Sequence, residues 1–290
     1  MDIRNVQKTG DMHYVYLPTS WCREHKIGAK SKISIEQNTD GTLLISPQIT
    51  EKKPKHLKFL ISEDEPELIH KLVVAAYINP VSSFDITLEK ELDFTKLLNH
   101  KRLISLENVE IDQKHITAEG QIIISDPHSL LKTMVKKIKN LAIVMKKQYN
   151  KELVDRYEDE IDRSKMLIDK AVIGSFMFER TMKVKNIELY YIALISKELE
   201  RLVDHLISFE KKHPKFLDSL LEPIGQLQLI LENPLSLDIK KAFSFAKIVS
   251  LLKEVPIRDL QSYELTRIKQ NLITISEVIM DWAVTLMVEK

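Results

Sequence analysis

The sequence predicts a multidomain protein in which a β-rich N-terminal module and a small α+β middle domain precede an all-α helical bundle. Three observations support this fold class. Apolar and polar residues alternate with a period of two in parts of residues 1–50, a pattern typical of half-buried strands. From residue 126 onward, apolar residues recur at three- and four-residue spacing, as in amphipathic helices. Glycine is scarce, with 6 residues among 290, which favours long helices over a sandwich or barrel.

The N-terminal module, residues 1–50, is too small to bury all of its predicted strand faces alone. We therefore expect it to pair with a second copy of the chain. Its predicted elements are a strand at 12–17 ended by Pro18, a helix from Thr19 or Ser20 to Ile27 with Gly28 just after it, strands at 31–36 and 42–46, and a turn at 38–41 between these two strands.

The middle domain, residues 56–124, follows a basic linker that contains Pro54. Strand-like and helix-like segments alternate along it, which predicts a small α+β domain. Its predicted elements are a strand at 56–61, a helix at 66–77, a strand at 84–88, a helix at 93–106, and a hairpin of 109–112 with 115–124.

The C-terminal domain, residues 126–290, is predicted to be a bundle of antiparallel neighbouring helices. Asp126 is suited to cap the first helix, and Pro127 to occupy its first position. Residues 215–288 weakly duplicate 126–211. The later helices are predicted at about 151–179, 187–210, 216–232, 238–253 and 258–288.

Charge and cysteine content limit the classes of function. With 43 basic and 42 acidic residues, the net charge of +1 predicts neither a nucleic-acid coat nor affinity for a membrane surface. The single cysteine, Cys22, excludes an intramolecular disulfide and a cysteine zinc cluster, and favours a reducing compartment. Residues 1–11 lack a signal-peptide core, and no apolar run reaches spanning length. We expect a cytoplasmic protein without membrane insertion.

Acidic stripes on two predicted helices are the strongest candidates for a site. Asp159 and Asp162 belong to a stripe on the second helix of the bundle, and Glu200 and Asp204 lie four residues apart on the third. Like charges at this spacing repel by about 0.2–0.5 kcal/mol per pair, which a bound cation would offset. If the two helices pack antiparallel, the four carboxylates converge and suit a cation such as Mg, Mn or Fe.

The alternative is that these stripes are ordinary solvated helix faces crossed by ion pairs. In that case Arg201 pairs with Glu198 or Asp204, and Lys197 pairs with Glu200. Arg156 and Arg163 then pair with Asp159. Spacing alone leaves both interpretations open.

The run Glu200–Arg201–Leu202–Val203–Asp204–His205 resembles the ERxxDH-like signature of PhoU-type phosphate-uptake regulators. Asp159–Glu160–Ile161–Asp162 resembles the D-x-x-[IV]-D-like run of the preceding helix, one residue shorter. The resemblance implies a three-helix bundle that holds metal through Glu200 and Asp204, with Asp159 and Asp162. In the second half Thr266 and Gln270 replace the Glu and the Asp, which leaves a single site for a divalent or iron-type metal.

The first 48 residues resemble an AbrB/SpoVT-type swapped-hairpin domain, in which two chains interlace into a DNA-binding dimer. The matching run extends from Met12 to Pro47. The order of the two modules on one chain resembles archaeal phosphate regulators. We predict that the DNA face consists of Arg4 and Lys8 near the start, and of Arg23 and Lys26 around the helix. Alternatively, these residues are solubilising charges on a module that only dimerises.

These observations predict a phosphate-responsive regulator that binds DNA as a homodimer and controls phosphate uptake and homeostasis. The main alternative is a dimeric adaptor that docks on a phosphate transporter ATPase or a signalling kinase without binding DNA. No Gly-rich phosphate loop occurs, and the nine histidines are scattered without ligand spacing, so we expect no enzyme. A metal-dependent enzyme of unknown reaction is the weakest alternative.

Overall fold

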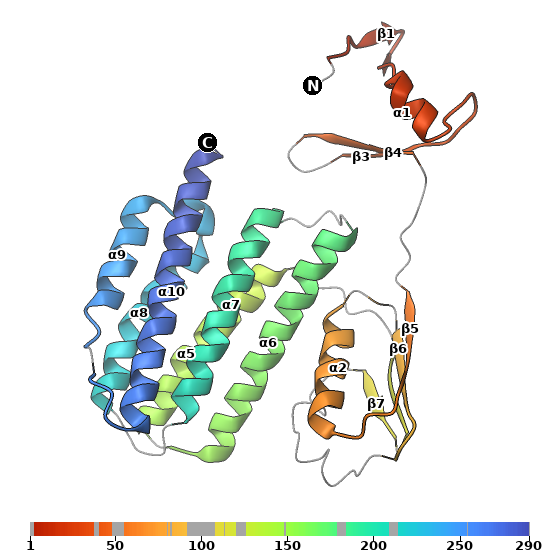
Figure 1. Ribbon diagram of the computed structural model, residues 1–290. Coiled ribbons are helices and arrows are strands. Elements are labelled where there is room, and N and C mark those ends of the chain that lie inside the picture. The colour runs from red at the N-terminus through yellow and green to blue at the C-terminus, as the bar shows by residue number, and fades with distance from the viewer. Residues whose placement is uncertain are drawn as a thin grey trace. The chain divides into compact units, whose positions relative to one another are not determined.

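The computed structural model divides the chain into two compact units, Met1–Lys52 and Lys53–Lys290 (Figure 1). Its described residues are mostly helical with small sheets, which confirms the mixed helix and strand content that the sequence predicts. The predicted helix at 93–106 and parts of the predicted turn and hairpin lie outside the described residues. The structure describes residues 3–37, 41–47, 55–79, 81, 83–91, 108–112, 114–119, 126–147, 149–178, 184–208, 214–253 and 255–289.

The first unit consists of two hairpins and a short helix. One hairpin pairs β1 (Gln7–Thr9) with β2 (Met12–Tyr14), and the other pairs β3 (Ser34–Gln37) with β4 (Leu43–Ser46); both are antiparallel. The sequence did not predict β1, because its residues are all polar and show no apolar alternation. Gly10, at φ +60°, provides the left-handed residue of the first turn, and Gly41, at φ +85°, is the last residue of the turn predicted at 38–41.

Helix α1 (Thr19–Glu24) ends three residues before the predicted boundary at Ile27. Lys26, and not Gly28, is the left-handed residue after the helix, with φ +53°. Its N–H donates to the Arg23 carbonyl (3.2 Å), and the Ile27 N–H donates to the Cys22 carbonyl (2.8 Å). This pair of bonds is a Schellman motif, which satisfies two carbonyl groups at the end of the helix.

The first unit has no core of its own. None of its described residues is buried. Its side chains nevertheless include a large apolar set that is exposed to solvent: Ile3, Val6, Met12, Tyr14, Val15, Tyr16, Ile35, Leu43 and Ile45.

The second unit begins with a four-stranded sheet in the order β5-β6-β8-β7, as the hairpin and strand predictions require. β5 and β6 are parallel, because α2 forms the crossover between them, and the other pairs are antiparallel. Ile69 and Val73 of α2 pack on Phe84, Ile86 and Ile116 of the sheet. The elements are β5 (His56–Ile61), α2 (Pro66–Ile78), β6 (Ser83–Leu88), β7 (Val109–Ile111) and β8 (His115–Glu119).

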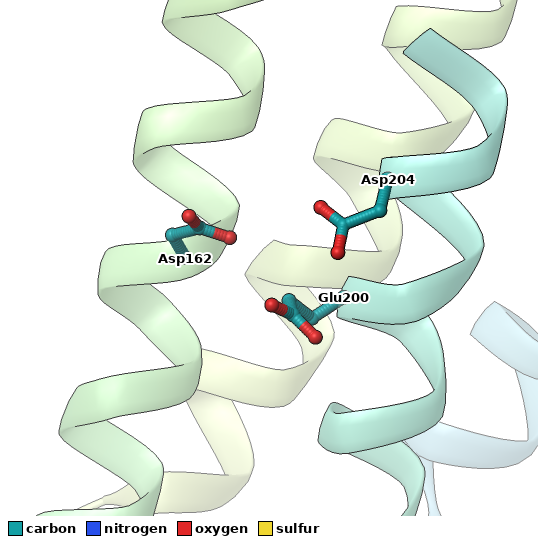
Figure 2. A group of neighbouring side chains, drawn as sticks. All are labelled: Asp162, Glu200 and Asp204. Carbon is teal, nitrogen blue, oxygen red and sulfur yellow. The ribbon is translucent and has the colours of Figure 1, made fainter. Parts of the chain in front are cut away.

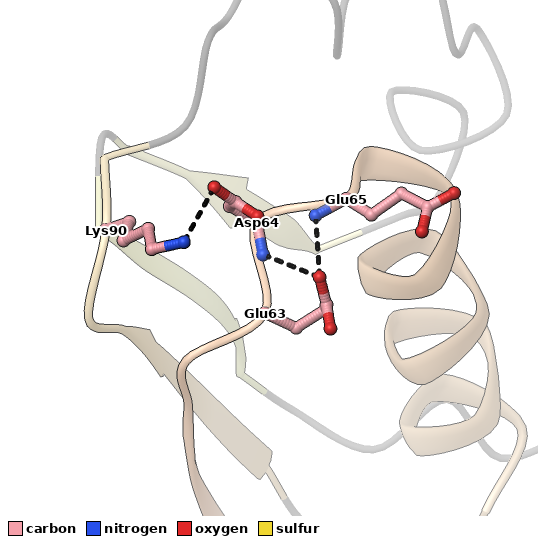
Figure 3. Close-up of polar contacts among 4 residues, drawn as sticks. All are labelled: Glu63, Asp64, Glu65 and Lys90. Atoms are coloured by element: carbon pink, nitrogen blue, oxygen red, sulfur yellow. Dashed lines mark hydrogen bonds and ion pairs between the residues drawn. The ribbon is translucent and has the colours of Figure 1, made fainter.

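Figure 3 shows the turn that leads from β5 into α2. The Glu63 carboxylate accepts hydrogen bonds from the N–H groups of Asp64 (3.2 Å) and Glu65 (3.3 Å). Lys90, which follows β6, donates from Nζ to Asp64 Oδ2 (3.0 Å), and this hydrogen bond raises the pKa of Lys90. Both side chains are exposed, so the pair orders the turn more than it stabilises the fold.

The rest of the second unit is a helical bundle in which α7 packs between α6 and α10. α5 packs against α8, and α9 packs against α8 and α10. The contacting pairs α5–α8 and α7–α10 join helices that the predicted weak duplication would make equivalent. The helices are α5 (Pro127–Lys147), α6 (Lys151–Phe178), α7 (Asn186–Ile207), α8 (Pro214–Glu232), α9 (Ile239–Ser250) and α10 (Leu260–Val288), with a 3-10 turn at Pro234–Ser236.

Helix α10 is long and apolar enough to cross a membrane by length and composition, and it is the one such helix among the described residues. Half of its most apolar stretch is buried inside the bundle. There Trp282 stacks on Tyr191 of α7 (5.7 Å between ring centroids), and Tyr191 Oη lies 2.6 Å from Thr285 Oγ1. An apolar helix of this kind is also what the centre of a bundle requires.

The bundle and the α+β sheet belong to one compact unit, although the sequence separates them at residues 124–126. Helix α6 packs on α2, and Met166 of α6 contacts the apolar core of the sheet. Lys170 of α6 is buried and donates from Nζ to the Tyr77 carbonyl in the last turn of α2 (2.6 Å). The same ammonium lies 4.6 Å from the centroid of the Tyr77 ring. These contacts join the α+β part of the chain to the bundle.

Candidate metal centre

Helices α6 and α7 are amphipathic, and their buried stripes fix which way the acidic side chains face. On α6, Val154, Ile161 and Ile168 are buried in the bundle core. On α7, Leu199 and Leu202 are fully buried. Residues directly beside these stripes lie at the edge of the seam between the two helices. The packing of α6 against α7 therefore brings their flanking acids together.

Three carboxylates meet at this seam (Figure 2). Asp162 of α6 points toward Glu200 and Asp204 of α7, and oxygens of the three side chains all lie within 4.8 Å of one another. Asp162 is almost buried, Glu200 is half-buried and Asp204 is exposed. The group therefore has one solvent-accessible side, through which an ion could enter.

Asp159, the fourth predicted ligand, is not part of this group. It lies on α6 three residues before Asp162, a rise of about 4.5 Å along the helix axis. Ion pairs occur around the group within α6 and within α7, and Lys137 Nζ of α5 also pairs with Glu160 Oε2 of α6 (3.1 Å). Arg201 donates to Glu198 (Nη1 to Oε1, 2.9 Å), and Arg156 contacts Glu160 (3.4 Å) where the sequence suggested Asp159.

A second contact holds α7 beside the three carboxylates. His205, which follows Asp204, lies with Nδ1 2.5 Å from Glu264 Oε2 of α10, and both side chains are mostly buried. The Tyr263 ring meets His205 edge-on. Sequence reasoning missed Glu264 as a partner of His205, because the two residues are 59 positions apart and only helix packing joins them.

The matching positions on α10 have other roles. Thr266, which stands where Glu200 stands in the first half, donates its hydroxyl to the carbonyls of Ser262 (2.8 Å) and Val255 (3.2 Å). Gln270, which stands where Asp204 stands, is exposed. Among the described residues, the three carboxylates at the α6–α7 seam are the one group with ligand spacing.

The donor set fits a hard or borderline cation. All three donors are carboxylate oxygens, which Mg²⁺, Mn²⁺ and Ca²⁺ prefer, and no soft thiolate or thioether belongs to the group. Two oxygens on one octahedral Mg²⁺ lie about 3.0 Å apart when adjacent and about 4.2 Å apart when opposite, since each bond is about 2.1 Å long. At most one of the three oxygen pairs can be opposite, so a bound ion would draw the side chains closer than the observed limit of 4.8 Å. Three protein ligands leave coordination positions for water or for phosphate oxygens.

The four residues predicted to contact DNA lie in the first unit. Lys8 is in β1 and Arg4 precedes that strand, whereas Arg23 is in the last turn of α1 and Lys26 is its left-handed terminator. All four are exposed. They come from two separate elements of a unit that has no core.

Comparisons with models of protein families, with curated proteins and with solved structures gave no match to this chain.

Proposed function

We propose that this chain is a dimeric, phosphate-responsive regulator. Its first unit pairs with a second copy and binds DNA, and its bundle binds a divalent or iron-type cation through Asp162, Glu200 and Asp204. Phosphate binds to this cation and so changes the activity of the regulator. The regulator acts in the cytoplasm and controls the uptake of phosphate into the cell. The proposal includes no catalytic step.

The observation that carries this proposal is the first unit without a core. Nine large apolar side chains stand exposed in the strands of two small hairpins and in the segments that flank the first one. Isolated two-stranded hairpins are marginally stable, and exposed apolar patches of this kind mark association surfaces. Ile35 of β3 and Ile45 of β4 are cross-strand partners, and both are exposed, so each hairpin offers an apolar face for a second copy. Interlacing two copies would supply the missing core.

Pairing of two copies also favours DNA binding. One copy contributes Arg4, Lys8, Arg23 and Lys26, and a dimer presents these side chains twice, related by a two-fold axis as in a palindromic operator. Each neutralised phosphate adds to the affinity through counterion release. The acids of the unit oppose this field, so binding should be weak on random DNA and strongly dependent on salt.

The bundle supplies the response to phosphate. A cation held by three carboxylates retains open positions, and phosphate oxygens are strong ligands for hard cations. Helix α6 carries Asp162 and also Met166 and Lys170, which contact the α+β part of the unit. A change at the cation is therefore transmitted along α6 to a second part of the protein.

The first experiment tests pairing. Sedimentation velocity of the full chain should give a dimer at micromolar concentration, and Ile35→Asp should give a monomer. Leu229→Asp is the matched control, because Leu229 is equally exposed but lies on α8 of the bundle. A wild-type monomer, or equal effects of the two variants, would contradict the proposal.

The second experiment tests DNA binding by fluorescence anisotropy, with duplexes from upstream of phosphate-transport genes. Affinity should fall steeply between about 50 and 200 mM salt. The charge reversals Arg4→Glu and Lys8→Glu should abolish binding, whereas Lys136→Glu and Lys147→Glu on α5 should not. A folded dimer that binds no DNA at low salt would favour the alternative, an adaptor for a phosphate transporter ATPase or a signalling kinase. Docking on such a partner should survive the Arg4 and Lys8 reversals.

A further inference from the structure

The outward face of α9 combines lysines with exposed apolar side chains. With 3.6 residues per turn, Lys240, Phe243, Lys247 and Leu251 fall within about 80° of one another around the helix. Phe243 is 55% exposed and Leu251 is 77% exposed. No acidic residue occurs between Ile239 and Leu252. The face is therefore basic and apolar at once, which an ordinary solvated surface is not.

The positive charge of this face is not offset locally. Within the described part of the chain, the cationic groups of Lys240, Lys247, Lys253 and Arg258 have no carboxylate within ion-pair distance. The segment after α9 contains the acids Glu254 and Asp259, and Asp238 precedes the helix, so only α9 itself lacks acids. Asp238 accepts from the Lys241 N–H (2.8 Å), and Asp259 accepts from the Ser262 N–H (2.8 Å). A net charge of +1 for the whole chain thus hides a local basic surface.

Exposed apolar side chains continue beyond α9. Ile257 is 62% exposed, and Leu260, the first residue of α10, is 71% exposed. They lie in and next to the segment that carries Lys253 and Arg258. This segment also contains Glu254 and Asp259, so the surface that is basic and apolar without acids is the outward face of α9.

We propose that the outward face of α9, with Lys240, Phe243, Lys247 and Leu251, binds an anionic lipid bilayer, with α9 lying along the interface. The occupant must supply negative charge to the lysines and accept the apolar side chains that stand between them. Anionic headgroups over acyl chains provide both, and basic amphipathic helices with Phe and Leu bind there. Helix α9 lies at the edge of the bundle (Figure 1), and its Phe243 and Leu251 side chains are exposed to solvent. A flat bilayer can contact such a face along its length, whereas a peptide helix binds best in a groove.

This inference goes beyond the proposed function and does not depend on it. It concerns a peripheral association, which needs no membrane-spanning segment. It would place the regulator at the membrane through α9 whether or not the first unit binds DNA.

The test is co-sedimentation of the full chain with vesicles of phosphatidylcholine and phosphatidylglycerol in roughly equal parts, with pure phosphatidylcholine vesicles as the reference. The wild type should bind the anionic vesicles only. Replacing Lys240 and Lys247 by Glu should weaken binding about 30-fold or more, since each basic residue contributes about 1 kcal/mol at an anionic surface. Phe243→Ser with Leu251→Ser should weaken it about tenfold. Circular dichroism checks that each variant is folded.

Lys136→Glu with Lys147→Glu is the matched control, because both lysines are exposed on α5 without apolar neighbours of this kind. It changes the charge of the chain by the same amount as the α9 lysine pair and should leave vesicle binding nearly unchanged. Three outcomes would overturn the proposal: no binding of the wild type to anionic vesicles at low salt, equal losses in the α5 and α9 pairs, or capture by an acidic helical peptide without any vesicle binding. The last result would assign the face to a protein partner. Because the lysine pair is fully exposed, its result stands even if the Phe243 and Leu251 variant fails to fold.

Discussion

Replacing Asp162 by Asn should have opposite effects on stability with and without a divalent cation. In metal-free protein, two carboxylate charges 4.8 Å apart repel by about 0.9 kcal/mol in a water-like dielectric. Asp162 takes part in two of the three pairs of the group. Asn keeps the shape and the hydrogen-bonding capacity of the side chain but removes both repulsions. Removal of these repulsions should therefore make the variant more stable than the wild type by about 1 kcal/mol after screening by salt.

With cation present, the order should reverse. A ligand at a hundredfold excess over its dissociation constant stabilises the folded state by about 2.7 kcal/mol, and the variant loses most of this gain because it lacks one of three charged ligands. Urea unfolding followed by circular dichroism, in EDTA and then in excess MnCl₂, measures both differences. Metal content of the purified wild type and of Asp204→Asn gives an independent check.

Asp159→Asn is the matched control, because Asp159 lies on the same helix but outside the group of three. It should respond to Mn²⁺ as the wild type does. The reasoning would be refuted if Asp162→Asn were less stable than the wild type in EDTA, or if both proteins gained equally from Mn²⁺. Loss of the Mn²⁺ response in Asp159→Asn would show that the site extends further along α6.

Three further predictions concern Lys170 of α6, the cap of α5 and the end of α1. Lys170→Met should lower the free energy of unfolding by about 1–2 kcal/mol, because the buried Tyr77 carbonyl loses its hydrogen-bond donor. Amide exchange in the last turn of α2 should become faster. Unchanged exchange would show that this contact does not join the α+β part to the bundle. Asp126→Ala should lower the free energy of unfolding by about 1 kcal/mol at neutral pH, because α5 loses its N-terminal cap. Hydrogen bonds from Ser129 lower the pKa of Asp126, so the cap stabilises the fold above the ordinary carboxyl pKa, and the difference between variant and wild type should vanish as the pH falls through the lowered value. Lys26→Gly should slow amide exchange in α1 by stabilising its end by about 0.5–1 kcal/mol, because glycine adopts the left-handed conformation without strain; faster exchange would contradict the role of Lys26 as terminator.

Local patterns in the sequence were sufficient to locate most elements. Period-two alternation indicated a strand at 31–36, which overlaps β3, and the 3.6-residue period identified the six long helices of the bundle to within a few residues. Such patterns are local, because the side of a helix or strand that faces the core is determined by residues a few positions apart. Prediction failed where no apolar pattern exists, as in β1, and where an unexpected residue took the left-handed conformation, as Lys26 does.

The sequence by itself determined that acids flank the buried stripes of α6 and α7, because spacing along one helix fixes which residues share a face. Only the tertiary structure decided which of them meet. It brings Asp162 to Glu200 and Asp204, leaves Asp159 outside, and joins His205 to Glu264 and Lys170 to Tyr77 across long stretches of chain. These contacts depend on the rotation and axial offset of one helix against another. Those quantities result from the packing of the whole core, and no local window of sequence contains them.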